Sequence, residues 1–214
     1  MSIKHSLSLL SLSLLSLSFL MTPSIRVSHA APPTKASASA QRAASKPIKR
    51  LINAIRYNKD ALALKSFDGE AQGELLFGAL WTQQPAAERA RFVKTLHDFF
   101  SVVAFPKLRA DFEHLETILY GEPQPGQEGE LKLRATIVVL HALKKDEVPV
   151  DFLLKRQPKG ELLISDFWIA PRDASAPSFL TRLKQDQVGP LLKKEGWSGL
   201  LSAMERRVAE LKKR

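Results

Sequence analysis

Three histidines and two aspartates are the side chains of this sequence best suited to acid–base or metal chemistry. His97, His114 and His141 lie far apart along the sequence, and none shares a ligand spacing with another histidine. Because the chain also lacks cysteine, the pattern does not predict a metal site. Asp166 and Asp173 stand near the end of an expected strand. A pair of these two carboxylates, or of Asp166 with His141, would suit general acid–base catalysis. Nothing in the spacing brings such a pair together.

Residues 196–199 (Gly-Trp-Ser-Gly) resemble a nucleophile elbow that is one residue short, because Leu200 stands where the last glycine belongs. No histidine follows this segment to complete a triad. We interpret it as a turn with a packing Trp197 and a Ser198 that caps the helix after it. A glycine-rich phosphate loop is also absent from the sequence. The residues therefore favour a protein that is not an enzyme and needs no cofactor, in which apolar side chains carry the function.

The first thirty residues predict export from the cytoplasm. Lys4 supplies a basic head, residues 7–21 form a Leu/Ser run, and residues 28–30 (Ser-His-Ala) place small residues where a signal peptidase cuts. The alternative is a retained membrane anchor, but the run is shorter than the ~20 apolar residues that span a bilayer. We expect a signal peptide over residues 1–30, cleavage after Ala30, and a periplasmic protein.

The charge and the lack of cysteine limit the partners of the exported chain. The net charge is +10, and it becomes +8 when cleavage removes Lys4 and Arg26. Export argues against nucleic acid, so the basic surface either aids solubility or attracts anionic lipid headgroups or an acidic protein. Without cysteine there is no disulfide and no lipoprotein anchor at the cleavage site, so packing alone must hold the fold.

The patterning predicts helices, then strands, then helices. Residues 31–46 are Ala/Ser/Pro/Lys-rich and read as a disordered leader, so the folded domain is expected over residues 47–214. Helical stripes begin at Pro47 and fill residues 85–105, where Pro106 is expected to end the helix. Apolar alternation predicts strands at residues 131–139, 148–154 and 162–169, with an earlier one within residues 112–120. The last forty residues return to helix.

Consecutive strands joined by short turns pair as an antiparallel meander. The expected fold class is therefore α+β, with one sheet of about four strands and the helices gathered on one side. A sheet that curls around Phe-rich helices leaves either a pocket or a filled core, and the residues allow both.

Three stretches carry a resemblance to a known family. Residues 159–167 form a Gly turn and a strand that closes on Asp166, and residues 179–183 begin an aromatic-led helix that is followed by Gly196 and a Leu-rich helix. Upstream, Leu80 and Trp81 precede a helix start with Glu88, Arg89 and Phe92. Over residues 47–211 the chain resembles the MlaC, or toluene-tolerance, family of periplasmic phospholipid-binding proteins, which are auxiliary components of an ABC-type lipid-transport system.

The resemblance implies a cone-like single domain that encloses a cavity for acyl chains. It implies a monomeric, non-enzymatic carrier that shuttles phospholipid between an inner-membrane ABC complex and an outer-membrane lipoprotein complex, and so maintains outer-membrane lipid asymmetry. The candidate cavity residues are the apolar set Leu96, Phe99, Phe100, Val103, Leu133, Ile137, Val139, Val150, Phe152, Phe167, Ile169, Leu183, Val188 and Leu192. Two alternatives stay open: a periplasmic interaction or chaperone module without lipid, and a small cavity enzyme using Asp166 and His141.

Overall fold

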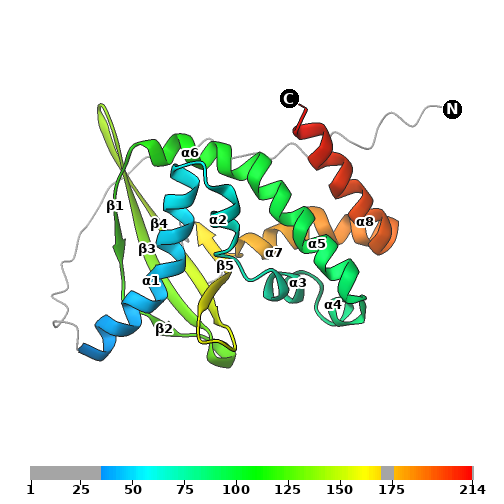
Figure 1. Ribbon diagram of the computed structural model, residues 1–214, viewed down its shortest axis with the longest axis horizontal. Coiled ribbons are helices and arrows are strands. Elements are labelled where there is room, and N and C mark those ends of the chain that lie inside the picture. The colour runs from blue at the N-terminus through cyan, green and yellow to red at the C-terminus, as the bar shows by residue number, and fades with distance from the viewer. Residues whose placement is uncertain (1–34, 170–175, 214) are drawn as a thin grey trace. The chain divides into compact units, whose positions relative to one another are not determined.

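The computed structural model describes residues 35–169 and 176–213, and its elements follow the expected order of helices, strands and helices (Figure 1). The first helices are α1 (Lys35–Arg56), α2 (Asp60–Leu64), α3 (Gly69–Phe77), α4 (Ala79–Gln83), α5 (Ala86–Phe99), the π-helical η2 (Phe100–Ala104) and α6 (Phe105–Glu113). The middle holds β1 (Leu115–Tyr120), β2 (Gln124–Pro125), the 3-10 turn η3 (Gln127–Gly129), β3 (Leu131–His141), β4 (Lys144–Arg156) and β5 (Leu162–Ile169). The chain then forms α7 (Phe179–Leu183), the π-helical η4 (Lys184–Val188) and α8 (Gly189–Leu211). The predicted signal peptide and Asp173 lie outside the described residues.

The sheet confirms the predicted α+β class with antiparallel pairing. Its strand order is β1-β3-β4-β5, and the short β2 pairs with β3. Leu133 lies opposite Phe152, which lies opposite Phe167 on β5. Because side chains alternate across a strand, this register places all seven sheet residues of the candidate set on one face: Leu133, Ile137, Val139, Val150, Phe152, Phe167 and Ile169. We call this the inner face.

Helix α1 packs on the sheet through one apolar stripe. Ile48, Leu51, Ile52 and Ile55 recur at helical spacing, and all four are buried. The helix contacts β3 and β5, where it joins the same hydrophobic core as the inner face (Figure 1). The predicted helix from Pro47 is therefore part of a longer element.

The disordered leader predicted for residues 31–46 is wrong from Lys35 onward, because α1 already begins there. Ala44 is fully buried, and the amide of Gln41 donates hydrogen bonds to the backbone carbonyls of Tyr120 and Gly121, at 2.9 and 2.8 Å. Alanine has the highest helix propensity, and these contacts at the end of β1 hold the first turns in place. A composition that resembles a linker thus forms a packed helix.

The helix predicted over residues 85–105 begins as expected after Pro85 but does not end at Pro106. It widens into the π-helical turn η2, in which the backbone N–H of Phe105 donates to the carbonyl of Phe100, and continues as α6. Pro106 then stands at the second position of α6, where a missing N–H costs no intrahelical bond. The π-turn therefore carries the chain past a residue that would otherwise end the helix.

Two glycines with positive φ divide the remaining helices. Gly78 (φ 56°) separates α3 from α4, and Gly196 (φ 66°) bends α8 at the turn predicted from residues 196–199. Each adopts a backbone conformation that costs glycine little. Among the described residues, no helix combines the length and apolarity needed to cross a bilayer.

Asp151 is a buried carboxylate on the opposite, outer face of the sheet. Its side chain is 3% exposed and accepts two hydrogen bonds from Arg134, at 2.6 and 2.9 Å, while the ammonium of Lys132 lies 3.1 Å away. Lys132 also lies over the ring of Trp168, 5.1 Å from its centre. The Arg134 hydrogen bonds, aided by Lys132, hold the pKa of Asp151 below its ordinary value.

We expect Asp151→Asn to lower the free energy of unfolding at pH 7 by about 1.5–3 kcal/mol, the usual contribution of a hydrogen bond to a charged group. A pKa that is lower in the folded than in the unfolded chain stabilises the fold above the unfolded value, about 3.9. This contribution is lost as the pH falls through the folded pKa, so the variant and the parent should converge under acid conditions. Urea unfolding at neutral and acid pH measures both values.

Asp146→Asn is the matched control, because Asp146 pairs with Lys144 at the exposed end of the β3–β4 hairpin. Exposed pairs contribute about 0–1 kcal/mol. An Asp151→Asn variant no less stable than this control at pH 7 would contradict a stabilising role for the carboxylate.

Candidate functional site

A row of aromatic rings joins the sheet to the helices. The ring of Phe152 on β4 lies 6.3 Å from that of Phe167 on β5, which stacks on Phe179 of α7 at 4.8 Å and 12°. Phe179 lies 5.9 Å from Phe100, and Phe100 lies 5.3 Å from Phe67 before α3. We call these five residues the aromatic seam. It draws aromatic side chains from five separate parts of the sequence into one continuous contact.

Both helical segments beside the seam contain a π-helical turn. Phe100 begins η2, and Val188 ends η4, which directly follows α7. Both side chains are buried, and α8, which continues η4, contacts η2. π-helical turns are rare and are frequent at functional sites. Both π-helical turns therefore lie beside the aromatic seam.

Most of the fourteen candidate residues lie in one hydrophobic core. Eight are buried: Leu96, Phe100, Leu133, Ile137, Val139, Val150, Phe152 and Val188. Four are half-buried and packed against this core: Phe99, Phe167, Leu183 and Leu192. Val103 is half-buried, and Ile169 is 56% exposed at the end of β5. The fold brings the set together, and lipid contact by its members stays a prediction.

Three further residues of this region were not among the candidates: Phe67, Phe179 and Tyr120. Phe179 is the first residue of the short helix α7 and is central to the aromatic seam, although the sequence indicated only an amphipathic turn there. Tyr120 lies opposite Ala135 of β3, on the inner face, and its hydroxyl is buried without a hydrogen-bond partner. Burial raises the pKa of Tyr120 to about 12. The alternation of β1 (Ile118, Tyr120) carried the signal that could have identified this residue.

Two surface grooves lie beside the helices, and none of the fourteen residues lines either one. The larger, about 580 Å³, lies between the segment before α3 and helix α5, with Leu64, Phe67, Val93 and His97 in its wall. The smaller, about 340 Å³, lies between α5 and α8 beside the Arg91–Glu205 ion pair. The larger groove reaches the aromatic seam through Phe67. The core residues of the candidate set therefore pack against one another and do not border these hollows.

His97 connects this groove to the aromatic seam. Its ring lies 6.3 Å from Phe67 and 6.4 Å from Phe100, and its Nε2 atom is buried without a hydrogen-bond partner. Burial lowers the pKa of His97, although the nearby Asp98 carboxylate opposes the shift. The imidazole is therefore neutral at pH 7 and contributes mainly packing surface.

The proposed pair of Asp166 and His141 is not assembled, so the cavity enzyme based on it is wrong. His141 lies opposite Lys144 and Asp166 lies opposite Leu153, so about 30 Å of strand separates them at ~3.3 Å per residue. Asp166 instead accepts hydrogen bonds from the backbone N–H groups of Phe167 and Leu180, at 2.8 and 3.1 Å. Burial raises the pKa of Asp166, and hydrogen bonding by the Ser178 side chain and by these two N–H groups partly offsets that effect. The carboxyl group fastens β5 to the start of α7.

The remaining histidines lie at the far end of the sheet. The rings of His114 and His141 are 5.3 Å apart, and His141 lies 3.7 Å from the Asp146 carboxylate. In the part of the chain that the structure describes, no three histidine or acidic side chains form a group that could hold a metal ion.

A solved structure shares the fold of this chain. No protein-family model matches the chain, and neither does any curated protein sequence. A solved phospholipid-binding protein from Ralstonia solanacearum, in complex with a phospholipid, superposes with a TM-score of 0.62. The alignment covers 80% of this chain and 98% of that protein at 16% sequence identity. The chain therefore shares the α+β fold of that protein, over nearly the whole length of that protein and most of this chain.

Proposed function

We propose that this protein binds phospholipid through its acyl chains, between the inner face of the sheet and the helices of the aromatic seam. The similarity of fold to a protein solved with a bound phospholipid is the observation that carries the proposal. The continuous apolar surface from Phe152 through Phe167 to Phe100 supports it, because acyl chains need apolar walls and few polar groups.

Physical chemistry sets the scale of such binding. Each methylene removed from water contributes about 0.8 kcal/mol, so two chains of about 15 methylenes gain roughly 24 kcal/mol against water. Most of this gain offsets extraction from a membrane, and the headgroup stays in solvent. A carrier therefore needs an apolar interior, but its affinity for phospholipid should not exceed that of the membranes or complexes that donate and accept the lipid. The orphan hydroxyl of Tyr120 on the inner face is a donor available to an ester carbonyl of the lipid.

We further propose that the protein is exported to the periplasm, released after Ala30, and shuttles phospholipid between inner- and outer-membrane complexes without enzymatic chemistry. The short apolar run of residues 7–21 and the Ser-His-Ala of residues 28–30 support export. An ABC-type complex and an outer-membrane lipoprotein complex are the proposed docking partners, and outer-membrane lipid asymmetry is the proposed outcome.

A second candidate is a periplasmic interaction or chaperone module without cargo. It is favoured by one observation: eight candidate residues are buried within a packed core, away from both grooves.

Mass spectrometry of protein purified without detergent distinguishes the two candidates. The carrier should retain about one phospholipid per chain and should take up lipid from vesicles. Protein that contains no lipid and extracts none from vesicles would support the cargo-free module.

A further inference from the structure

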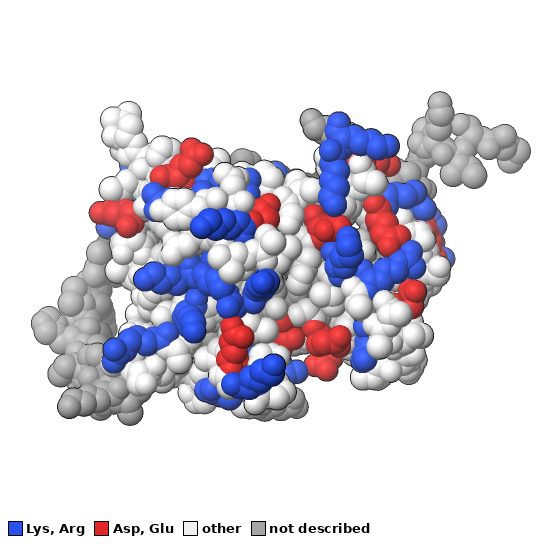
Figure 2. Space-filling model, in the orientation of Figure 1, with Lys and Arg blue, Asp and Glu red and all other residues white. Residues whose placement is uncertain are grey.

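Helix α1 carries a basic stripe on the face opposite its packed one. Arg42, Lys46, Lys49 and Arg56 recur at steps of four, three and seven residues, which places them on one side of a helix. From Arg42 to Arg56 the stripe extends about 21 Å at 1.5 Å per residue. Lys59 continues it beyond the end of the helix. Figure 2 shows Lys and Arg side chains gathered over α1 and α2.

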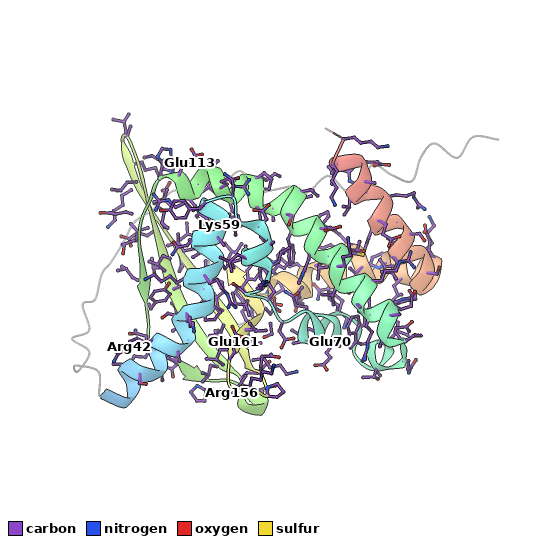
Figure 3. All side chains as sticks on the ribbon, viewed as in Figure 1. Arg42, Lys59, Glu70, Glu113, Arg156 and Glu161 are labelled. Carbon is purple, nitrogen blue, oxygen red and sulfur yellow. The ribbon has the colours of Figure 1, made fainter. Side chains whose placement is uncertain are left out.

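Five exposed cations of this region have no acidic partner among the described residues: Arg42, Lys46, Lys49, Lys59 and Lys65. Two acids beside the stripe are already paired, since Glu161 bonds Arg50 at 2.9 Å and Asp60 bonds Arg109 at 2.7 Å. Figure 3 places Arg42 and Lys59 toward the two ends of α1, with Glu113 and Glu161 at the border of the region. We call the five cations the α1 basic face. Its charge is available to an external anion.

Two apolar side chains lie exposed beside the α1 basic face. Tyr57 is 62% exposed and Leu62 is 42% exposed, on either side of Lys59. The guanidinium of Arg56 lies over the Tyr57 ring, 5.7 Å from its centre. Basic side chains with an exposed aromatic and an aliphatic residue are the combination that binds the interface of a bilayer.

We propose that the α1 basic face docks this protein on a membrane surface that contains anionic phospholipid headgroups. Four of its five cations are lysine, and lysine is depleted at interfaces between proteins. A flat anionic surface attracts each basic residue independently, and flexible lysine side chains meet scattered phosphates without fixed geometry. The purpose of such docking rests on the proposed carrier role, because a carrier must reach a membrane or the complexes within it. The attraction itself comes from the charge pattern alone.

The test is binding of the purified protein to vesicles of phosphatidylcholine with and without phosphatidylglycerol, measured by sedimentation at low and high salt. The parent should bind the anionic vesicles, and salt should release it. Lys46→Gln/Lys49→Gln should weaken the binding about 25-fold, since each basic residue near an anionic surface contributes about fivefold. Both side chains are exposed, so the substitutions should not disturb the fold.

Lys193→Gln/Lys213→Gln is the matched control, because it removes the same charge from exposed lysines on and beyond α8. Its affinity for anionic vesicles should stay within about twofold of that of the parent. The reason is that a charge farther than a Debye length from the docked surface contributes little to the attraction. Equal losses in the two double variants, or a parent that ignores anionic vesicles, would overturn the proposal; an acidic protein would then be the better partner for this face.

Lipid content separates this proposal from the carrier function. Lys46→Gln/Lys49→Gln should keep the phospholipid content of the parent while losing vesicle binding. If no variant contains lipid but vesicle binding follows the expected pattern, the carrier function fails and the docking surface stands. If the parent has normal lipid content but shows no preference for anionic vesicles, the docking surface fails and the carrier function stands.

Discussion

Trp81→Ala should reduce the free energy of unfolding by about 3–5 kcal/mol, the usual cost of removing a fully buried large aromatic side chain. Trp81 is 0% exposed, and its ring lies 5.7 to 6.1 Å from those of Phe92, Phe77 and Trp197. Its Nε1 donates a hydrogen bond of 3.0 Å to Glu70. These contacts join α3, α4, α5 and α8, so the cavity left by alanine would loosen four helices together.

Denaturant unfolding followed by far-UV circular dichroism measures this loss. Leu143→Ala is the control, because Leu143 is 99% exposed at the tip of the β3–β4 hairpin and surface substitutions usually change stability by less than about 0.5 kcal/mol. Gly73→Ala provides an independent check, since a Cβ at this position would collide with the Trp81 ring. If Trp81→Ala and Leu143→Ala unfold at the same denaturant concentration, the rings of Trp81 and its three aromatic neighbours do not form a cooperative unit.

Phe167→Asp should lower the phospholipid retained per folded protein by at least tenfold. Phe167 lies on the inner face between Phe152 and Phe179, and it is half-buried, so an acid here enters the middle of the aromatic seam. An unpaired carboxylate in apolar surroundings costs several kcal/mol, and about 1.4 kcal/mol corresponds to a factor of ten in binding. An acyl chain bound beside it would remove the water that hydrates the charge.

Phe167→Leu is the matched variant, because it keeps an apolar side chain and should retain lipid within about twofold of the parent. Circular dichroism of both variants separates lost lipid from lost fold, and mass spectrometry of detergent-free protein counts the lipid. A folded Phe167→Asp variant with the lipid content of the parent would show that acyl chains do not contact the seam.

The inner face of the sheet is the part of the fold that followed most directly from the sequence. Leu133, Ile137 and Val139 alternate with polar residues, and a period of two places them on one side of a strand whatever the neighbours are. The register of β3 with β4 and β5 confirms this assignment. The apolar stripe of α1 followed in the same way from a period near 3.6.

The seam was less accessible to such reasoning. Phe100, Phe167 and Phe179 each belong to a local apolar pattern, but their stacking depends on how α7 lies against β5. Asp166 is similar: the sequence offers it as an acid for catalysis, but its partners are the backbone N–H groups of Phe167 and Leu180 and the side chain of Ser178. Local patterns cannot distinguish these uses of a side chain, because the partners come from distant parts of the chain.

Periodicity alone was enough to predict an α+β domain with one apolar sheet face, since it reflects the geometry of a single strand or helix. Three-dimensional packing determined the rest. The first turns of α1 are ordered because Gln41 bonds the end of β1, 79 and 80 residues away, and the helix passes Pro106 because a π-turn precedes it. Whether apolar side chains fill a core or line a hollow depends on the distance between the layers, a quantity that no single segment of sequence specifies.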